Sequence, residues 1–150
     1  MDMMIRRAEL LDIEEMAMID EKCFSSPWSI DAFHRELTKN KIAFYMVAEI
    51  GGFVVAYAGL WRVEDEGHIT NVAVLPEYRG MHIASALLEV MFDVCAGEGI
   101  VDYTLEVRKS NAPARLLYEK HGFRNEGVRP GYYQDDKEDA LIMWRRGNEV

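Results

Sequence analysis

Two short stretches of the 150-residue sequence combine residue types and spacings that can do chemistry. The first is the loop at residues 79–84, which contains Arg79 and Gly80 and directly precedes an apolar helical pattern. The N-terminus of a helix offers unpaired N–H groups and about half a positive charge, so this loop can hold a phosphate or a pyrophosphate. Neither a P-loop nor the GxGxxG dinucleotide fingerprint is present there, so an ordinary strand-to-helix turn is an equally good interpretation.

The second stretch is the apolar segment around Glu106, which is followed by a helix that carries Tyr118. Alternate side chains of a strand point to opposite faces, so Glu106 shares a face with Thr104 and Arg108. A carboxylate within an apolar strand is costly unless it is paired or solvated. One interpretation is therefore a structural ion pair between Glu106 and Arg108, and the other is a general base at a cleft.

The hydrophobic pattern indicates which elements must position these two stretches. Apolar alternation predicts strands, and apolar residues at i, i+3, i+4 and i+7 predict helices. Asp12 and Glu15 have the spacing of a capping box that starts the first helix, and the second helix follows Ser29. Gly51 and Gly52 suit a two-residue hairpin turn, because both can adopt positive φ. Strands are expected at residues 3–7, 43–50, 53–63, 68–74, 103–107, 123–128 and 140–145, and helices from residue 12, after residue 29, over 87–95 and over 111–121.

The resulting order, β-α-α-β-β-β-α-β-α-β-β, predicts a mixed sheet with helices over its faces. Three successive strands over residues 43–74, with a turn at 65–67, favour an antiparallel meander. The residues expected to face the core are Ile13, Met16, Ala17 and Cys23 in the first helix, and Ile30, Phe33, His34 and Leu37 in the second.

Length and composition limit the class of protein. A chain of this length matches one domain, so we expect a single domain over residues 1–150, with 49% hydrophobic residues to form its core. Lys and Arg number 17 against 26 Asp and Glu, and the net charge of −9 disfavours direct binding of nucleic acid. An anionic ligand would need a local positive site, made by a helix N-terminus and a few basic side chains.

Cysteines, histidines and apolar runs bear on the compartment and on metals. Cys23 and Cys95 lie far apart in apolar helical patterns, which predicts buried free thiols in a reducing compartment. The longest apolar run, residues 53–61, is far shorter than the roughly 18 residues of a membrane helix, and no signal-peptide pattern opens the chain. The histidine spacing matches no metal-binding pattern. We therefore expect a cytoplasmic protein that has no metal and does not contact the membrane.

The two chemical stretches belong to longer motifs. Residues 72–88, VAVLPEYRGMHIASALL, resemble the acetyl-CoA motif of the GNAT acetyltransferases, with R-x-x-H-x-A at 79–84 against the family's Q/R-x-x-G-x-G/A. Residues 105–123, LEVRKSNAPARLLYEKHGF, together with 129–143, look like the RimI-type ribosomal-protein alanine N-acetyltransferases. The pattern F-x-x-P-W-S at 24–29 fits the same family, so the resemblance covers nearly the whole chain.

The resemblance implies an α/β (α+β) fold of the GNAT type, with a mixed, mostly antiparallel sheet of six to seven strands and about four helices. It also implies acetyl-CoA as co-substrate. The residues that it assigns to acetyl-CoA are Val72, Ala73, Val74, Arg79, Gly80, Met81, His82, Ile83, Ala84, Asn111 and Tyr118. Glu106 occupies the family's general-base position and Tyr118 its general-acid position, and a strand amide near Val72 occupies that of the donor to the thioester oxyanion.

The chain departs from the family pattern at His82, which stands where glycine is usual and where backbone is expected to approach phosphate closely. One interpretation is an imidazole that points to solvent. The other is an imidazolium that adds positive charge beside the phosphates. Trp28 and Tyr132 are our candidates for the walls of an acceptor-peptide cleft, although aromatic side chains also serve as ordinary packing.

The pKa of the acceptor amine favours a protein N-terminus. An α-amino group has a pKa of about 7.7–8.0 and a lysine one of about 10.4, so neutralising the lysine near pH 7.5 costs about 4 kcal/mol. Neutralising the terminus costs well under about 1 kcal/mol, which a single carboxylate base can more easily supply. The charge of −9 also suits a basic partner such as a ribosomal protein.

These observations predict an acetyltransferase that modifies the N-terminal amine of a protein beginning with Ala or Ser, by direct attack in a ternary complex. The expected partner is a small-subunit ribosomal protein, and the enzyme is expected to be a monomer or a weak dimer. One alternative is acetylation of lysine or of a small-molecule amine by the same fold. The other is a non-catalytic CoA-binding module, against which the presence of both Glu106 and Tyr118 argues.

Overall fold

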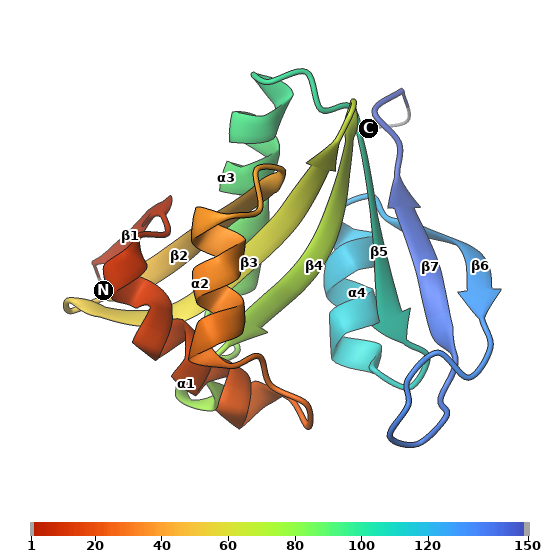
Figure 1. Cartoon of the computed structure of the whole chain (residues 1–150). Helices are drawn as coiled ribbons and strands as arrows, with labels where there is room; N and C mark the ends of the chain where they lie inside the picture. The colour runs from red at the N-terminus through yellow and green to blue at the C-terminus, as the bar shows by residue number, and fades with distance from the viewer. Residues whose placement is uncertain (1, 149–150) are drawn as a thin grey trace.

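The computed structural model describes residues 2–148, which form one seven-stranded sheet with helices on both faces (Figure 1). The strand order is β1-β2-β3-β4-β5-β7-β6. The strands are β1 Met3–Arg7, β2 Ala43–Ile50, β3 Phe53–Val63, β4 Glu66–Val74, β5 Asp102–Arg108, β6 Arg124–Arg129 and β7 Ala140–Arg145. The helices are α1 Ile13–Cys23, α2 Ile30–Thr38, α3 Ile83–Ala96 and α4 Ala112–Lys120, with 3-10 turns at Leu10–Asp12 and Pro76–Tyr78. The predicted fold class and order of elements are confirmed.

The sheet opens between β4 and β5. Strands β2 to β4 form the predicted antiparallel meander, and Gly51 and Gly52 turn the β2–β3 hairpin at φ of 61° and 84°. Strand β1 pairs antiparallel with β2 at the edge of the sheet. The parallel pairing of β4 with β5 covers only residues 66–68 and 102–104, and the crossover between these strands runs through α3. Beyond this pairing β4 and β5 diverge, as Figure 1 shows. Along the gap, the backbone groups of each strand that face the other strand are no longer paired with it.

A β-bulge in β4 lies just after this pairing ends. Gly59 of β3 pairs with Asn71 and Leu60 pairs with Ile69, so Thr70 is the extra residue. A bulge bends its strand and increases the local twist. Gly59 is required there, because a Cβ at this position would overlap the ring of Tyr45. The bulge therefore lies where β4 turns away from β5.

Two apolar cores hold the sheet, one on each face. On the face covered by α3 and α4, the core contains residues such as Leu87 and Met91 of α3 and Phe123, which follows α4. On the other, α1 and α2 pack through Met16 and Phe33. Each of these side chains is at most 1% exposed, and burying one contributes about 1.5–3 kcal/mol to stability. No helix within residues 2–148 has the length and apolar character to cross a membrane.

Several local predictions were wrong, because tertiary contacts outweigh short-range signals. Ile30 and His34 were expected to face the core but are exposed, since α2 packs by a narrower stripe that contains Phe33. The turn expected at 65–67 lies at residues 64–65, and β4 begins at Glu66. Gly67 belongs to the strand, where a Cβ would lie 2.7 Å from the ring of Tyr103.

The start of α1 also differs from the prediction. The Asp12 carboxylate accepts the N–H of Glu9 at 2.7 Å and pairs with Arg6 at 2.8 Å. Glu15 does not complete a capping box with Asp12, because its carboxylate accepts the N–H of Val54 at 2.7 Å and so ties α1 to β3. Helix α3 begins at residue 83, so Ile83 and Ala84, which were expected in the loop before the helix, lie in its first turn.

Candidate active site

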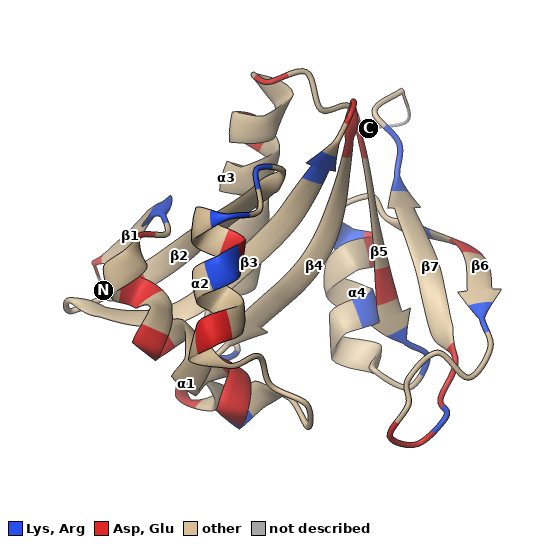
Figure 2. Cartoon of the chain, viewed as in Figure 1, with Lys and Arg blue, Asp and Glu red and all other residues tan. Residues whose placement is uncertain are grey.

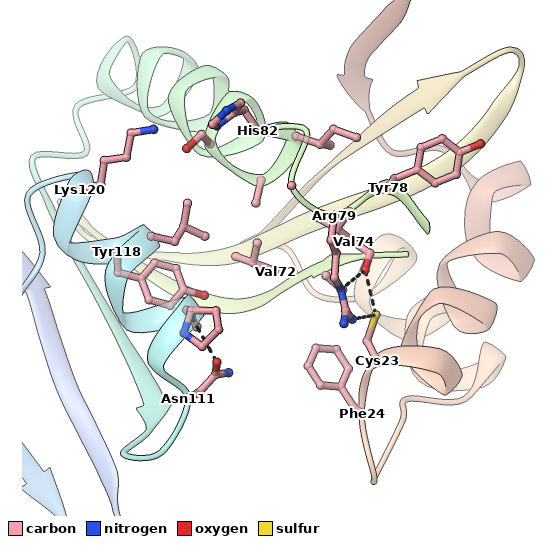
Figure 3. Close-up of a pocket in the computed structure, with 18 residues that line it drawn as sticks. Cys23, Phe24, Val72, Val74, Tyr78, Arg79, His82, Asn111, Tyr118 and Lys120 are labelled. Atoms are coloured by element: carbon pink, nitrogen blue, oxygen red, sulfur yellow. Dashed lines mark hydrogen bonds between the residues drawn. The ribbon is translucent and has the colours of Figure 1, made fainter. Parts of the chain in front are cut away.

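The gap between β4 and β5 is part of a cleft of about 560 Å³ (Figure 3). Its walls come from β4, from the first turn of α3, from α4 and from the C-terminal end of α1. Helices α3 and α4 belong to one face of the sheet, and α1 belongs to the other. The divergence of two neighbouring strands therefore gives a ligand access to side chains from both layers.

The loop before α3 places backbone N–H groups at this cleft. Gly80 has φ of 79° and His82 has φ of 62°, and these two left-handed residues turn the chain into the helix. The N–H of Ala86 bonds to the carbonyl of His82, so the amides that precede it in the first turn have no partner within the helix. Such amides and the helix dipole together attract a phosphate.

The conformation of His82 accounts for the glycine that is usual at this position. Residues other than glycine adopt left-handed conformations at some cost, and histidine is among the more tolerant of them. The side chain of His82 makes no capping hydrogen bond and is exposed at the rim of the cleft. An imidazole is thus accommodated without closing the cleft.

The cleft is basic although the protein is acidic. Among the described residues that line it are Arg79 and Lys120, and none is an Asp or Glu. The Arg79 Nε donates to the carbonyl of Val74 at 3.2 Å, and its Nη2 lies 3.4 Å from the sulfur of Cys23. These contacts hold a guanidinium at the end of β4. Figure 2 shows acidic residues concentrated elsewhere, on α1 and on the loop between β6 and β7.

The edge of β4 offers hydrogen-bonding groups to the cleft. The carbonyl of Val74 accepts from Arg79 and, at 3.3 Å, from the thiol of Cys23, so it faces away from β3. Residues two apart on a strand point their backbone groups to the same edge, so Val72 also faces the gap. Cys23 was expected in the core and instead lines the cleft half-buried. Cys95 is buried as predicted, and burial raises the pKa of its thiol to about 11.

Tyr118 brings a protonated phenol to the cleft from α4. Tyr118 is 9% exposed, and its ring packs edgewise on that of Phe123, with 5.7 Å between the ring centroids. Its hydroxyl points into the cleft (Figure 3). Burial, and then negative charge on Tyr133, raise its pKa above the usual range of tyrosine. At neutral pH this phenol is therefore a hydrogen-bond and proton donor. Asn111 lines the same wall and caps α4, with its Oδ1 accepting the N–H of Ala114 at 3.2 Å.

Glu106 approaches from the other face of β5. Its neighbours Leu105 and Val107 are buried, whereas the Glu106 side chain is 31% exposed. The interpretation of a Glu106–Arg108 ion pair was wrong. The cation beside Glu106 is Arg129 of β6, at 3.5 Å, and Arg108 instead binds carboxylates of the β6–β7 loop.

Sequence reasoning missed Tyr133, which interacts electrostatically with both predicted catalytic residues. Burial raises the pKa of Tyr133 to about 12, with smaller effects that include the charge of Glu106, and Tyr133 in turn raises the pKa of Tyr118. The predicted wall residue was its neighbour Tyr132, which is 48% exposed and contacts Tyr133 edgewise at 5.1 Å. No short-range pattern distinguishes the two tyrosines, since the distinction depends on contacts with β5.

Three other predicted residues do not line the 560 Å³ cleft. Trp28 packs against Phe33 at 5.4 Å and belongs to the core under α1 and α2. Met81 is exposed at the tip of the loop before α3, and Tyr132 lies on the β6–β7 loop. The remaining predicted cofactor residues are brought together at the cleft: Val72, Ala73, Val74, Arg79, Gly80, His82, Ile83, Ala84, Asn111 and Tyr118.

The sequence model of the Acetyltransferase (GNAT) family matches residues 13–123. The chain belongs to the GNAT acetyltransferase family. This GNAT chain is 42% identical over 145 residues to a Bacillus subtilis (strain 168) protein, covering 97% of this chain and 96% of that protein. The name of that relative gives ribosomal protein bS18-alanine N-acetyltransferase as a provisional activity.

Two further relatives carry related names. The Escherichia coli (strain K12) ribosomal protein bS18-alanine N-acetyltransferase is 34% identical over 141 residues, covering 93% of this chain and 94% of that one. The crystal structure of the E. coli enzyme gives a TM-score of 0.89 at 32% identity, covering 97% and 94% of the two chains. A Sulfurisphaera tokodaii protein named N-alpha-acetyltransferase is 35% identical over 156 residues, covering 93% and 90%. The predicted family and the GNAT fold are confirmed.

GNAT acetyltransferases use acetyl-CoA, and the residues of this cleft fit that molecule. Its phosphates can be bound by the unpaired amides before and in the first turn of α3, together with Arg79 and Lys120. The open edge of β4 can form hydrogen bonds to the amides of its arm, and the Tyr118 hydroxyl can donate to its sulfur. Within residues 2–148, no group of three or more His, Cys, Asp or Glu is arranged to hold a metal ion.

Proposed function

We propose that this GNAT enzyme acetylates the N-terminal amine of a protein that begins with Ala or Ser, and that its acceptor is a ribosomal protein. The activities named for the B. subtilis, E. coli and S. tokodaii relatives support this proposal. The structural observation that carries it is the placement of Tyr118 and Glu106. Tyr118 reaches the gap from the α4 face, Glu106 lies on the other face of β5, and Tyr133 is electrostatically coupled to both.

In this proposal acetyl-CoA enters between α3 and α4. The amides of residues 79–84, with Arg79 and Lys120, hold its phosphates, and Val72 and Val74 bond to its arm through their backbone. Asn111 contacts the same arm. The thioester then lies within the gap, where Tyr118 faces its sulfur. When bound, acetyl-CoA supplies an activated acetyl group.

The acceptor amine enters from the face that carries Glu106. Glu106 takes a proton from the ammonium, directly or through one water, so that the nitrogen has a free electron pair. The nitrogen forms a bond to the thioester carbonyl carbon, and the bond from that carbon to sulfur breaks. Tyr118 gives its proton to the departing thiolate and regains one through solvent, which balances the second proton that the nitrogen loses as the amide forms. The proton taken by Glu106 is the net proton released to solvent. A backbone N–H near Val72 stabilises the negative charge that develops on the carbonyl oxygen.

Direct transfer of this kind needs no acetylated side chain on the enzyme. Cys95 is buried and its pKa is raised to about 11, so its thiol stays protonated near neutral pH. Cys23 lines the cleft, but its thiol donates to the carbonyl of Val74 and contacts Arg79. We therefore assign neither cysteine to an acyl intermediate.

The proposal is tested with peptides of matched composition. Purified enzyme and acetyl-CoA are incubated with three peptides: one beginning with Ala, one beginning with Ser, and one with a blocked N-terminus and an internal lysine. Tandem mass spectrometry then locates any added acetyl group. Label on the free α-amine of the first two peptides supports the proposal. Label confined to the lysine would instead indicate a lysine acetyltransferase, and label on no acceptor would indicate a CoA-binding module.

A further inference from the structure

We propose that Arg108 is a positioning residue for the acceptor. It fixes the β6–β7 loop, residues 130–139, over the face of β5 that carries Glu106. This inference rests on the proposed function, in which the acceptor amine enters from that face. Arg108 itself contacts no reacting atom in this scheme, and it acts through Tyr133.

The guanidinium of Arg108 gathers three carboxylates of the loop. Its Nη2 donates to both oxygens of Asp135 at 2.9 Å, and its Nη1 donates to Asp136 at 3.0 Å and to Glu138 at 3.3 Å. Without a cation these acidic groups would repel one another within four residues of chain. The Arg108 side chain is 28% exposed, so water and salt screen these pairs only in part. The planar five-donor fork of arginine suits this set, which a lysine ammonium cannot match.

The same guanidinium supports Tyr133. Its carbon lies 4.0 Å from the centroid of the Tyr133 ring, so the ring is held against β5 by a cation–π contact. Two further bonds dock the loop beside Arg108: Glu138 accepts the N–H of Ser110 at 2.7 Å, and the carbonyl of Asp139 accepts the N–H of Lys109 at 3.2 Å. Arg108 and Glu106 are two residues apart on β5 and so share a face of the strand, and the placement of Tyr133 on that face therefore depends on Arg108.

A second contact joins this loop to the segment between α1 and α2. The Ser25 hydroxyl donates to the Asp135 carboxylate at 3.0 Å. Asp135 thus accepts from Arg108 and from Ser25 at the same time, and it links the two segments that flank the Glu106 face. Arg108 holds the loop end of this link, so its loss is expected to release Ser25 and Tyr133 together.

The experiment compares Arg108→Gln and Arg108→Lys with Arg146→Gln as a matched control. Arg146 also stacks on an aromatic ring, that of Trp144 at 4.0 Å, and also pairs with a carboxylate, Glu126 at 2.7 Å, but it lies beyond the other end of β7. The measurements are KM for the acceptor peptide, kcat, the Kd of acetyl-CoA by calorimetry, and hydrogen–deuterium exchange of residues 130–139.

We expect Arg108→Gln to raise the acceptor KM by about ten-fold or more, while the Kd of acetyl-CoA changes less than about two-fold. Exchange in residues 130–139 should accelerate, and Arg108→Lys should recover part of the KM effect. Ser25→Ala should raise the acceptor KM less than Arg108→Gln does. Arg146→Gln should leave acceptor KM and loop exchange as in the wild type.

An unchanged acceptor KM with unchanged loop exchange in Arg108→Gln would overturn the inference. So would equal losses of acceptor and acetyl-CoA binding together with a lower Tm, since that pattern marks general destabilisation. These outcomes are distinct from failure of the proposed function, which is read in the wild type as label on lysine or on no acceptor. Loop exchange is measured without substrate, so it tests the role of Arg108 in either case.

Discussion

At the level of single residues, the two proposed catalytic groups differ in their surroundings in the way that their roles require. The Glu106 side chain is 31% exposed, and one of its carboxylate oxygens lies 3.5 Å from the Nε of Arg129, so an amine can reach the carboxylate. Tyr118 is buried in an apolar wall, and its raised pKa keeps the proton that a thiolate needs. Proton acceptor and proton donor are thus separated by the open edge of β5.

Glu106→Gln tests the assignment of the base. The amide keeps the size of the side chain but cannot accept a proton, so kcat should fall by about 10²–10⁴-fold. The Kd of acetyl-CoA, measured by calorimetry, should change less than about two-fold, because Glu106 does not line the cleft. Glu126→Gln on β6 serves as the control, since that carboxylate binds Arg146. A kcat near that of the wild type in Glu106→Gln would remove Glu106 from the mechanism.

Tyr118→Phe tests the assignment of the acid. Loss of one hydroxyl leaves the packing on Phe123 in place, so the Tm should change little, while kcat should fall about 10–100-fold. Tyr103→Phe is the matched control, because Tyr103 is a buried tyrosine of β5 that does not line the cleft. If both variants turn over at the wild-type rate, Tyr118 has only a packing role.

At the level of elements, short-range signals predicted the parts but not the opening between them. The Gly51–Gly52 hairpin and the meander follow from local turn chemistry and alternation, and both were predicted. The cleft instead depends on where β4 stops pairing with β5 and on the bulge at Thr70. These features depend on contacts between residues far apart in the chain, such as the close approach of Tyr45 to Gly59 beside the bulge, which single-sequence patterns do not reveal.

The same distinction applies to the site. Most of the predicted cofactor residues belong to one continuous motif at residues 72–84, so the motif identified them together. The structure places most of them at one cleft. The proposed acceptor side is assembled from β5, the β6–β7 loop and the segment between α1 and α2, and there the sequence analysis chose Tyr132 rather than Tyr133. Only the packing of Tyr133 on Arg108 distinguishes the two residues.

The left-handed N-cap of α3 leads to a prediction about stability and acetyl-CoA binding. His82→Gly removes the steric cost of φ 62° but adds flexibility to the unfolded chain, so stability should stay within about 1 kcal/mol of the wild type. Acetyl-CoA should bind the glycine variant at least as tightly, because backbone is then free to approach the phosphates. His82→Val places a β-branched residue in this conformation and should lose about 1–2 kcal/mol. Chemical denaturation and calorimetry measure the two effects, and equal stability of the glycine and valine variants would contradict this account.

At the level of the whole molecule, charge is divided between two surfaces. The chain carries a net charge of −9, yet no described Asp or Glu lines the cleft that contains Arg79 and Lys120. Acidic residues lie on α1 and on the β6–β7 loop, and that loop is beside the face of β5 where the acceptor is proposed to enter (Figure 2). One protein can therefore attract an anionic co-substrate locally and a basic acceptor through its wider field.

This division predicts a salt dependence that differs between acceptors. Two peptides are compared that share an N-terminal Ala and differ only in whether the following positions carry arginine or glutamine. The screening length falls from about 30 Å at 0.01 M salt to about 8 Å at 0.15 M, so long-range attraction of the arginine peptide is largely lost over this range. Its kcat/KM should fall about 3–10-fold, with the change in KM rather than in kcat, while that of the glutamine peptide changes less than about two-fold.

Because both peptides use the same co-substrate, screening at the basic cleft affects them equally and cancels in the ratio of the two kcat/KM values. A ratio that is independent of salt would show that the acidic surface plays no part in acceptor capture, and selection would then rest on contacts within the site.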